Sequence, residues 1–65
     1  MNITRKTSHV EWFEIDGIVE SETGAFRQWL AEHPDFQILT FDFYNDEEHR
    51  PCFRVMTTTR KVEDA

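Results

Sequence analysis

The segment that most limits how this chain can fold is the aromatic stretch at residues 36–44, FQILTFDFY. It is rich in aromatic and β-branched side chains and alternates too regularly for a helix, which predicts a β-strand. The composition of residues 45–51 is typical of a loop. Residues 52–58 alternate again, with apolar or β-branched side chains at every second position. The pattern therefore predicts a hairpin of two strands in the second half of the chain.

The chemistry of the facing side chains indicates the register of this hairpin. Pairing Phe43 with Phe53 and Phe41 with Val55 brings apolar pairs together on one face. A shift by one residue would set aromatic side chains against Arg54, so this register should be preferred. The same register predicts three pairs on the opposite face: Asp42 with Arg54, Thr40 with Met56, and Tyr44 with Cys52.

A helix is expected before this hairpin, because bulky side chains recur at i, i+3, i+4 and i+7. The stripe consists of Phe26, Trp29, Leu30 and His33. Ser21 and Thr23 are both candidate N-caps, since a hydroxyl can accept a hydrogen bond from a free amide of the first turn. Pro34 disfavours helical geometry at the residue before it, so the helix should end near His33.

The first third of the chain allows two interpretations. Residues 9–15 read as a strand, and Asp16-Gly17 is a strong turn signal because glycine adopts positive φ freely. A three-residue loop with a bulge at Gly17 would group Phe13, Ile15 and Val19 on one face, and this bulged hairpin is the preferred prediction. A single bent strand is the alternative.

Together these elements predict an α+β fold with a small three- to four-stranded, mostly antiparallel sheet and one α-helix packed on one face, in the order β-β-α-β-β. We expect one domain over residues 1–65, frayed at about residues 1–7 and 60–65. The helix should meet the sheet residues Leu39, Phe41, Phe43, Phe53 and Val55 through Phe26, Trp29 and Leu30. The opposite sheet face would carry a second apolar set: Phe36, Ile38, Tyr44 and Met56, with Trp12 as a further candidate.

Composition narrows the class of protein. A hydrophobic content of 38% argues against a disordered chain, despite the formal net charge of −6. No apolar run approaches the roughly 20 residues of a membrane span, and no signal-peptide pattern follows Met1. A single cysteine cannot build an internal disulfide, which favours a reducing compartment, and we expect the cytoplasm. The acidic balance argues against direct nucleic-acid binding and favours a protein partner with a basic surface.

No constellation for chemistry is visible in the sequence. His49 and Cys52 have H-x-x-C spacing, but a structural zinc site needs four converging ligands, and no second pair exists. The neighbouring carboxylates at residues 46–48 would keep Cys52 a thiol rather than a reactive thiolate. We therefore predict no metal, no cofactor and no enzymatic activity.

The acidic residues give the leading functional hypothesis, a non-enzymatic protein-binding module that acts by occupying a partner's surface. Its sharper form is a DNA-mimic-like inhibitor of a host nucleic-acid-handling protein, of the kind phages encode. The partner-binding residues would be Asp42, Tyr44, Asp46, Glu47, Glu48, Glu11 and Glu14. The alternative is that residues 45–48 form only a solvated turn with no binding role.

A second hypothesis is a small structural or regulatory homodimer, such as an antitoxin-like or assembly component. It would self-associate through the outer sheet face, using Phe36, Ile38 and Met56, because aromatic residues and Met are enriched at interfaces. The same residues would instead be core if their face has been assigned wrongly.

Overall fold

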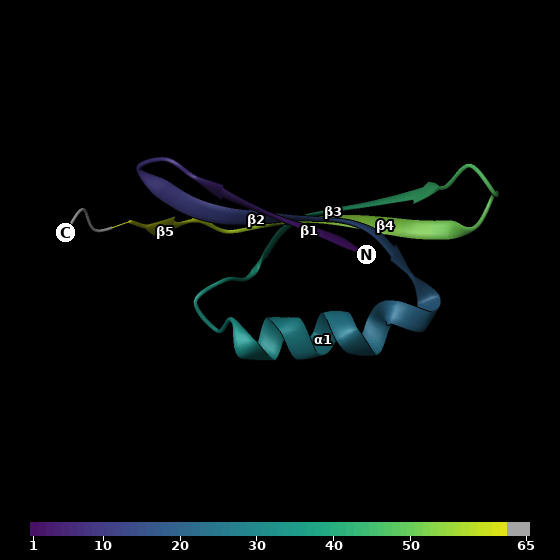
Figure 1. Ribbon diagram of the computed structural model, residues 1–65, viewed down its shortest axis with the longest axis horizontal. Coiled ribbons are helices and arrows are strands. Elements are labelled where there is room, and N and C mark those ends of the chain that lie inside the picture. The colour runs from purple at the N-terminus through teal and green to yellow at the C-terminus, as the bar shows by residue number, and fades with distance from the viewer. Residues whose placement is uncertain (63–65) are drawn as a thin grey trace.

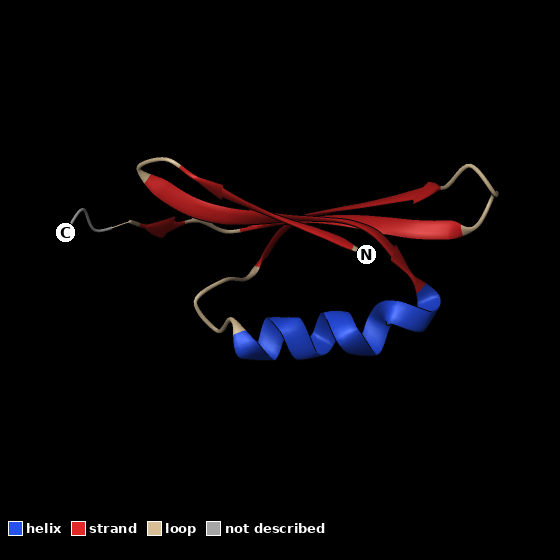
Figure 2. Ribbon diagram, in the orientation of Figure 1, coloured by secondary structure: helices blue, strands red, loops and turns tan. Residues whose placement is uncertain are grey.

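The computed structural model describes residues 1–62 and shows one helix lying against one face of a twisted antiparallel sheet (Figure 1). The elements follow in the order β1 (Asn2–Thr7), β2 (Val10–Val19), a 3-10 turn (Glu20–Glu22), α1 (Thr23–Glu32), β3 (Ile38–Asn45), β4 (Pro51–Thr57) and β5 (Arg60–Lys61). The sheet order is β1-β2-β4-β3, and β5 pairs with the start of β2. The predicted α+β fold, with one helix on one face, is confirmed (Figure 2).

The hairpin of β3 and β4 has the predicted register. Phe41 faces Val55 and Phe43 faces Phe53. The three pairs of the opposite face, Asp42–Arg54, Thr40–Met56 and Tyr44–Cys52, are also present. One irregularity was not anticipated: Ile38 pairs with Thr57 while Thr40 pairs with Met56, so the strand carries a bulge at Leu39.

The first third of the chain contains two strands, and β2 is the single bent strand of the alternative interpretation. β1 pairs with it antiparallel, from Asn2 opposite Asp16 to Thr7 opposite Glu11. The preferred bulged hairpin at Gly17 is wrong. Gly17 has a φ of 68° and lies in a bulge of β2, between Ile15 and the next residue paired with β4. The glycine therefore bends a continuous strand instead of ending it.

Both chain ends within residues 1–62 contain strands where fraying was expected. All six residues of β1 are exposed, and Ile3 is the one large apolar residue among them. The sequence of this strand therefore lacks the apolar alternation that predicts a β-strand. β5 covers Arg60–Lys61, and the remaining residues of the expected C-terminal fray, 63–65, lie outside the described part. The exposed polar side chains explain why these two strands resemble loose ends in the sequence.

The helix begins differently from the prediction but ends as expected. Neither Ser21 nor Thr23 caps it; the N-cap position is Glu22, and the hydroxyl of Thr23 donates to the Glu20 carbonyl at 2.9 Å. A 3-10 turn thus leads directly into α1. At the other end, the His33 amide donates to the Leu30 carbonyl at 3.1 Å, next to Pro34.

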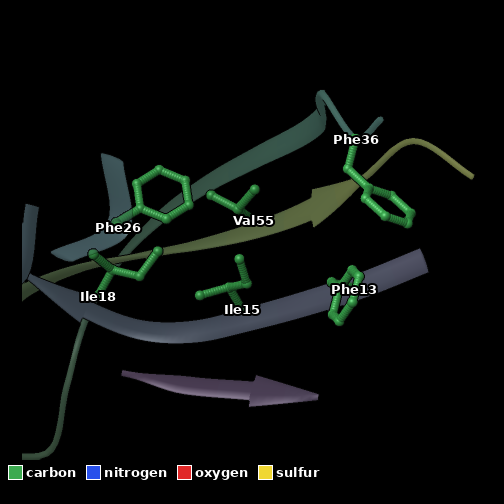
Figure 3. Packing of buried hydrophobic residues seen from close by; sticks show 6 residues of the cluster. All are labelled: Phe13, Ile15, Ile18, Phe26, Phe36 and Val55. Carbon is green, nitrogen blue, oxygen red and sulfur yellow. The ribbon is translucent and has the colours of Figure 1, made fainter. Parts of the chain in front are cut away.

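The core lies between α1 and the middle of the sheet. Its buried members are Phe13, Ile15, Ile18, Phe26, Phe36 and Val55 (Figure 3). The ring of Phe13 makes edge-to-face contacts with Trp29 at 4.9 Å and with Phe36 at 5.0 Å between centroids. These contacts join the centre of β2, the helix and the segment that leads into β3.

Phe36 corrects one sequence prediction. It was expected on the outer sheet face, but it is 6% exposed and packs in the core. The residue precedes β3, so the alternation of that strand does not determine its direction. The loop after Pro34 instead turns the ring toward Phe13.

Three predicted core residues lie outside the core. Leu39, Phe41 and Phe43 are 57%, 55% and 68% exposed, respectively. The strand order explains this, because β4 separates β3 from the centre at β2, where α1 packs. A helix about 10 Å in diameter covers roughly two strands spaced about 4.8 Å apart. The edge strand β3 is therefore left without cover.

Candidate interaction surface

The acidic loop between β3 and β4 is organised by Asp46. Its carboxylate accepts hydrogen bonds from the Glu48 amide at 2.9 Å, the Arg50 amide at 2.8 Å and the Arg50 Nε at 2.9 Å. These bonds, led by the one from the Arg50 amide, lower the pKa of Asp46 below its ordinary value. Asp46 is thus occupied within the loop, and of this trio Glu47 alone forms no ion pair within residues 1–62. Glu48 also lies 3.3 Å from the Arg50 guanidinium.

Glu11 was predicted to bind a partner, but the structure places it inside an ion-pair network. It is 7% exposed, and its carboxylate lies 3.1 Å from Arg5 and 2.6 Å from Arg60. Arg60 also reaches Asp35 at 3.1 Å. This buried carboxylate and its two arginine partners link β1, β2 and β5 to one another. Glu11 is therefore not available at the surface.

Tyr44 belongs to a polar cluster on the outer sheet face. Its hydroxyl donates to the Asp16 carboxylate at 2.5 Å, and the Arg54 guanidinium lies 4.8 Å from the Tyr44 ring centroid. Arg54 Nε is 3.3 Å from the same Asp16 oxygen. The hydrogen bond from Tyr44 is the main cause that lowers the pKa of Asp16. The cluster ties β2, β3 and β4 together on this face.

The outer face carries charges of both signs. A shallow groove of about 570 Å³ runs across it, lined by residues that include Glu14, Asp16, Asp42, Arg54 and Met56. Glu14 lies 4.0 Å from the Lys6 ammonium. Bases thus alternate with acids along the sheet, so the carboxylates predicted to bind a partner do not form one continuous acidic surface.

The residues predicted for self-association do not share a face. Met56 lines the outer groove, whereas Phe36 is in the core. Ile38 lies opposite Thr57, two residues from the core residue Val55, so it belongs to the helix side. The bulge at Leu39 causes this reversal, because an extra residue exchanges the two faces of a strand.

The most distinctive surface is the uncovered apolar strip of β3, which consists of Ile38, Leu39, Phe41 and Phe43. Each is more than 40% exposed, at 44%, 57%, 55% and 68%. Phe41 stacks on Phe53 at 5.1 Å between ring centroids, so the strip is continuous with the core. Within residues 1–62, β3 pairs only with β4, and the hydrogen-bonding groups along its other edge are unpaired by any strand. An apolar edge strand of this kind is a template for another chain.

The opposite edge of the sheet is different. β1 exposes one large hydrophobic residue, Ile3, at 41%. It also carries Arg5 and Lys6. Basic side chains on an edge strand discourage pairing with another strand, whereas β3 contains neither a base nor a proline. The two edges therefore differ in their capacity to dock a partner.

The alternation of β3 predicts packing against the helix, and it does not predict that Leu39, Phe41 and Phe43 are exposed. The available signal was geometric: one helix, about 10 Å wide, covers roughly two strands, whereas the sheet is wider than that. Which strand stays uncovered depends on the strand order, which the local pattern does not reveal.

Cys52 and His49 form no reactive pair. Cys52 is 1% exposed, and burial is the first cause that raises the pKa of its thiol, followed by the Asp46 charge. A raised pKa keeps the sulfur protonated, the opposite of what a nucleophile requires. No group of three metal-binding side chains converges anywhere in residues 1–62. In the same range, no helix combines the length and apolar character that a bilayer crossing requires.

Comparison with protein-family models, with curated proteins and with solved structures finds no match to this chain.

Proposed function

We propose that this protein is a non-enzymatic protein-binding module whose docking surface is the edge strand β3. The observation that carries the proposal is that the apolar strip of β3 coincides with an unpaired sheet edge. Most soluble monomers scatter their exposed hydrophobic residues, and a contiguous apolar patch marks an interaction site. A partner strand can bond to the free backbone groups, while its side chains cover the strip.

The acidic residues support this proposal less directly. Glu47 and Glu48 lie at the tip of the loop that follows β3, so they can guide a basic partner toward the strip. The inhibitor that imitates DNA remains a prediction with weaker support, because Lys6 and Arg54 interrupt the carboxylates on the sheet. The apolar strip therefore takes precedence as the proposed contact.

Affinity capture with matched variants tests the proposal. The wild-type protein is immobilised, exposed to lysate of the source cell, and the retained proteins are identified by mass spectrometry. Phe43→Asp places a charge in the strip at a residue that is 68% exposed, so folding should persist. Ile3→Asp is the matched control on the opposite edge.

We expect the retained proteins to be lost with Phe43→Asp and kept with Ile3→Asp. Equal retention by wild type and Phe43→Asp would exclude β3 as the docking surface. Loss of retention only when Glu47 and Glu48 are both changed to Lys would assign binding to the acidic loop instead.

A further inference from the structure

We propose that the partner of β3 is a second copy of this chain, joined through antiparallel pairing of the two β3 edges. The two five-stranded sheets would then form one continuous sheet with both helices on the same face. This inference rests on the proposed docking role of β3 and specifies its occupant. Three observations support it: the available area, the distribution of charge along β3, and the difference between the two sheet edges.

The strip would supply more than half of the area that a stable dimer needs. A large side chain presents about 200 Å², so the exposed fractions of the four strip residues leave about 450 Å² of their surface uncovered. A standard interface buries about 800 Å² on each partner. The free backbone edge of β3, eight residues long, would add to this area. In the proposed dimer, the strip is the apolar centre of the interface.

The distribution of charge selects a register. A two-fold axis normal to the sheet keeps both helices on one face, and it requires each residue to face one that points to the same side. Asp42 is the single charged residue of β3. A register centred on Asp42 would place two carboxylates opposite each other. Centring it on Phe41 sets Phe41 against its own copy and Phe43 against Leu39, while Asp42 faces Thr40 of the second copy.

The contrast between the two edges limits the assembly to two copies. Pairing β3 with β3 uses both apolar edges and leaves the two β1 strands, with their Arg5 and Lys6 side chains, on the outside. Pairing β3 with β1 of another copy would instead produce an open chain of molecules. The basic edge of β1 disfavours that outcome. The two apolar strips lie side by side between the two helices in the proposed dimer, where each extends the core of the other.

Solution mass is the primary test. Light scattering on a size-exclusion column, repeated over a range of protein concentrations, should give twice the chain mass of 7.8 kDa for the wild type. Phe43→Asp should give the mass of one chain, and Ile3→Asp should remain a dimer. Circular dichroism checks that each variant is folded. If Phe43→Asp fails to fold, Leu39→Asp replaces it, because Leu39 is also more than half exposed.

Cross-linking tests the register. Directly opposed residues of antiparallel strands have Cα atoms about 4.5–5.5 Å apart, within the range of a disulfide. A mixture of Thr40→Cys and Asp42→Cys chains should therefore form a disulfide-linked dimer on mild oxidation. Either chain alone should not, because diagonal neighbours are about 7–8 Å apart. The native Cys52 is buried and serves as an internal unreactive control.

Each outcome decides the inference. A wild-type protein that stays at the mass of one chain overturns the dimer. If Phe43→Asp abolishes the capture of another protein in that case, the proposed docking role of β3 still holds. A dimer that persists in Phe43→Asp places the interface elsewhere. Cross-linking of Asp42→Cys alone would refute the register centred on Phe41.

Discussion

Some aromatic residues of this protein are buried and others are exposed, so truncating one of each kind to alanine should lower the free energy of unfolding by unequal amounts. Phe13 is 8% exposed and is surrounded by other rings, whereas Phe43 is 68% exposed. We expect Phe13→Ala to destabilise the folded protein far more than Phe43→Ala. The comparison removes the same atoms from the same residue type, so in the dilute limit the difference reports how deeply each ring is buried in the single chain.

The magnitudes follow from the exposed fractions. At about 25 cal/mol/Å² and about 200 Å² per ring, the buried part of Phe13 corresponds to about 4.5 kcal/mol. The range for buried Phe→Ala substitutions is about 3–5 kcal/mol. The buried third of Phe43 corresponds to about 1.5 kcal/mol by the same conversion. A 65-residue domain has about 3–10 kcal/mol of stability in total, so Phe13→Ala should bring it close to unfolding.

Urea unfolding followed by tryptophan fluorescence and by circular dichroism measures both losses. Because dimerisation would add stability that depends on concentration, each variant is measured at several protein concentrations and extrapolated to low concentration. Equal losses for the two variants, or a larger loss for Phe43→Ala in the dilute limit, would refute the placement of the core between α1 and β2.

Three further predictions address single features. The hydrogen bond from the Tyr44 hydroxyl holds the pKa of the Asp16 carboxyl below its ordinary value of 3.8. The stabilisation from ionised Asp16 is therefore fully present above pH 3.8 and is lost as the pH falls through the lower pKa of the folded state. The difference in urea midpoint between wild type and Asp16→Asn should therefore shrink between pH 7 and about pH 2. Gly17→Ala should cost about 1 kcal/mol or more because of its φ of 68°, whereas Gly24→Ala in α1 should be neutral or stabilising, and thermal melting of both decides. Changing Glu47 and Glu48 to Lys should shift the unfolding midpoint by about 1 kcal/mol or less and leave the solution mass unchanged, and a lost dimer would assign the interface to the loop.

The parts of the fold that the sequence predicts correctly are local. The register of β3 and β4 follows from which side chains can face each other, and Arg54 excludes the neighbouring registers. The end of the helix at Glu32 follows from Pro34. Both inferences depend on residues close together in the chain, for which backbone geometry and side-chain chemistry agree.

The failures have a common cause in tertiary arrangement. β1 is polar because it is an exposed edge strand, so its sequence resembles a loose terminus. The turn chemistry at Gly17 is compatible with both a hairpin and a bulge, and pairing with β4 decides between them. The sequence also does not predict that β3 is the exposed apolar strand. Which strand the helix leaves uncovered depends on strand order, a long-range property.

The pairing of β2 with β4 also has a consequence for the folding kinetics of this chain. Each outer ladder joins strands adjacent in sequence, so the β1–β2 and β3–β4 hairpins can close rapidly on their own. The central ladder instead joins Ile15 to Val55 across the whole intervening helix. Closing that long loop costs entropy before the core contacts form, which makes the docking of the two hairpins the expected rate-limiting step. Until it occurs, Ile15 and Val55 remain exposed on separate hairpins, and the folding barrier lies at the centre of the sheet instead of at its turns.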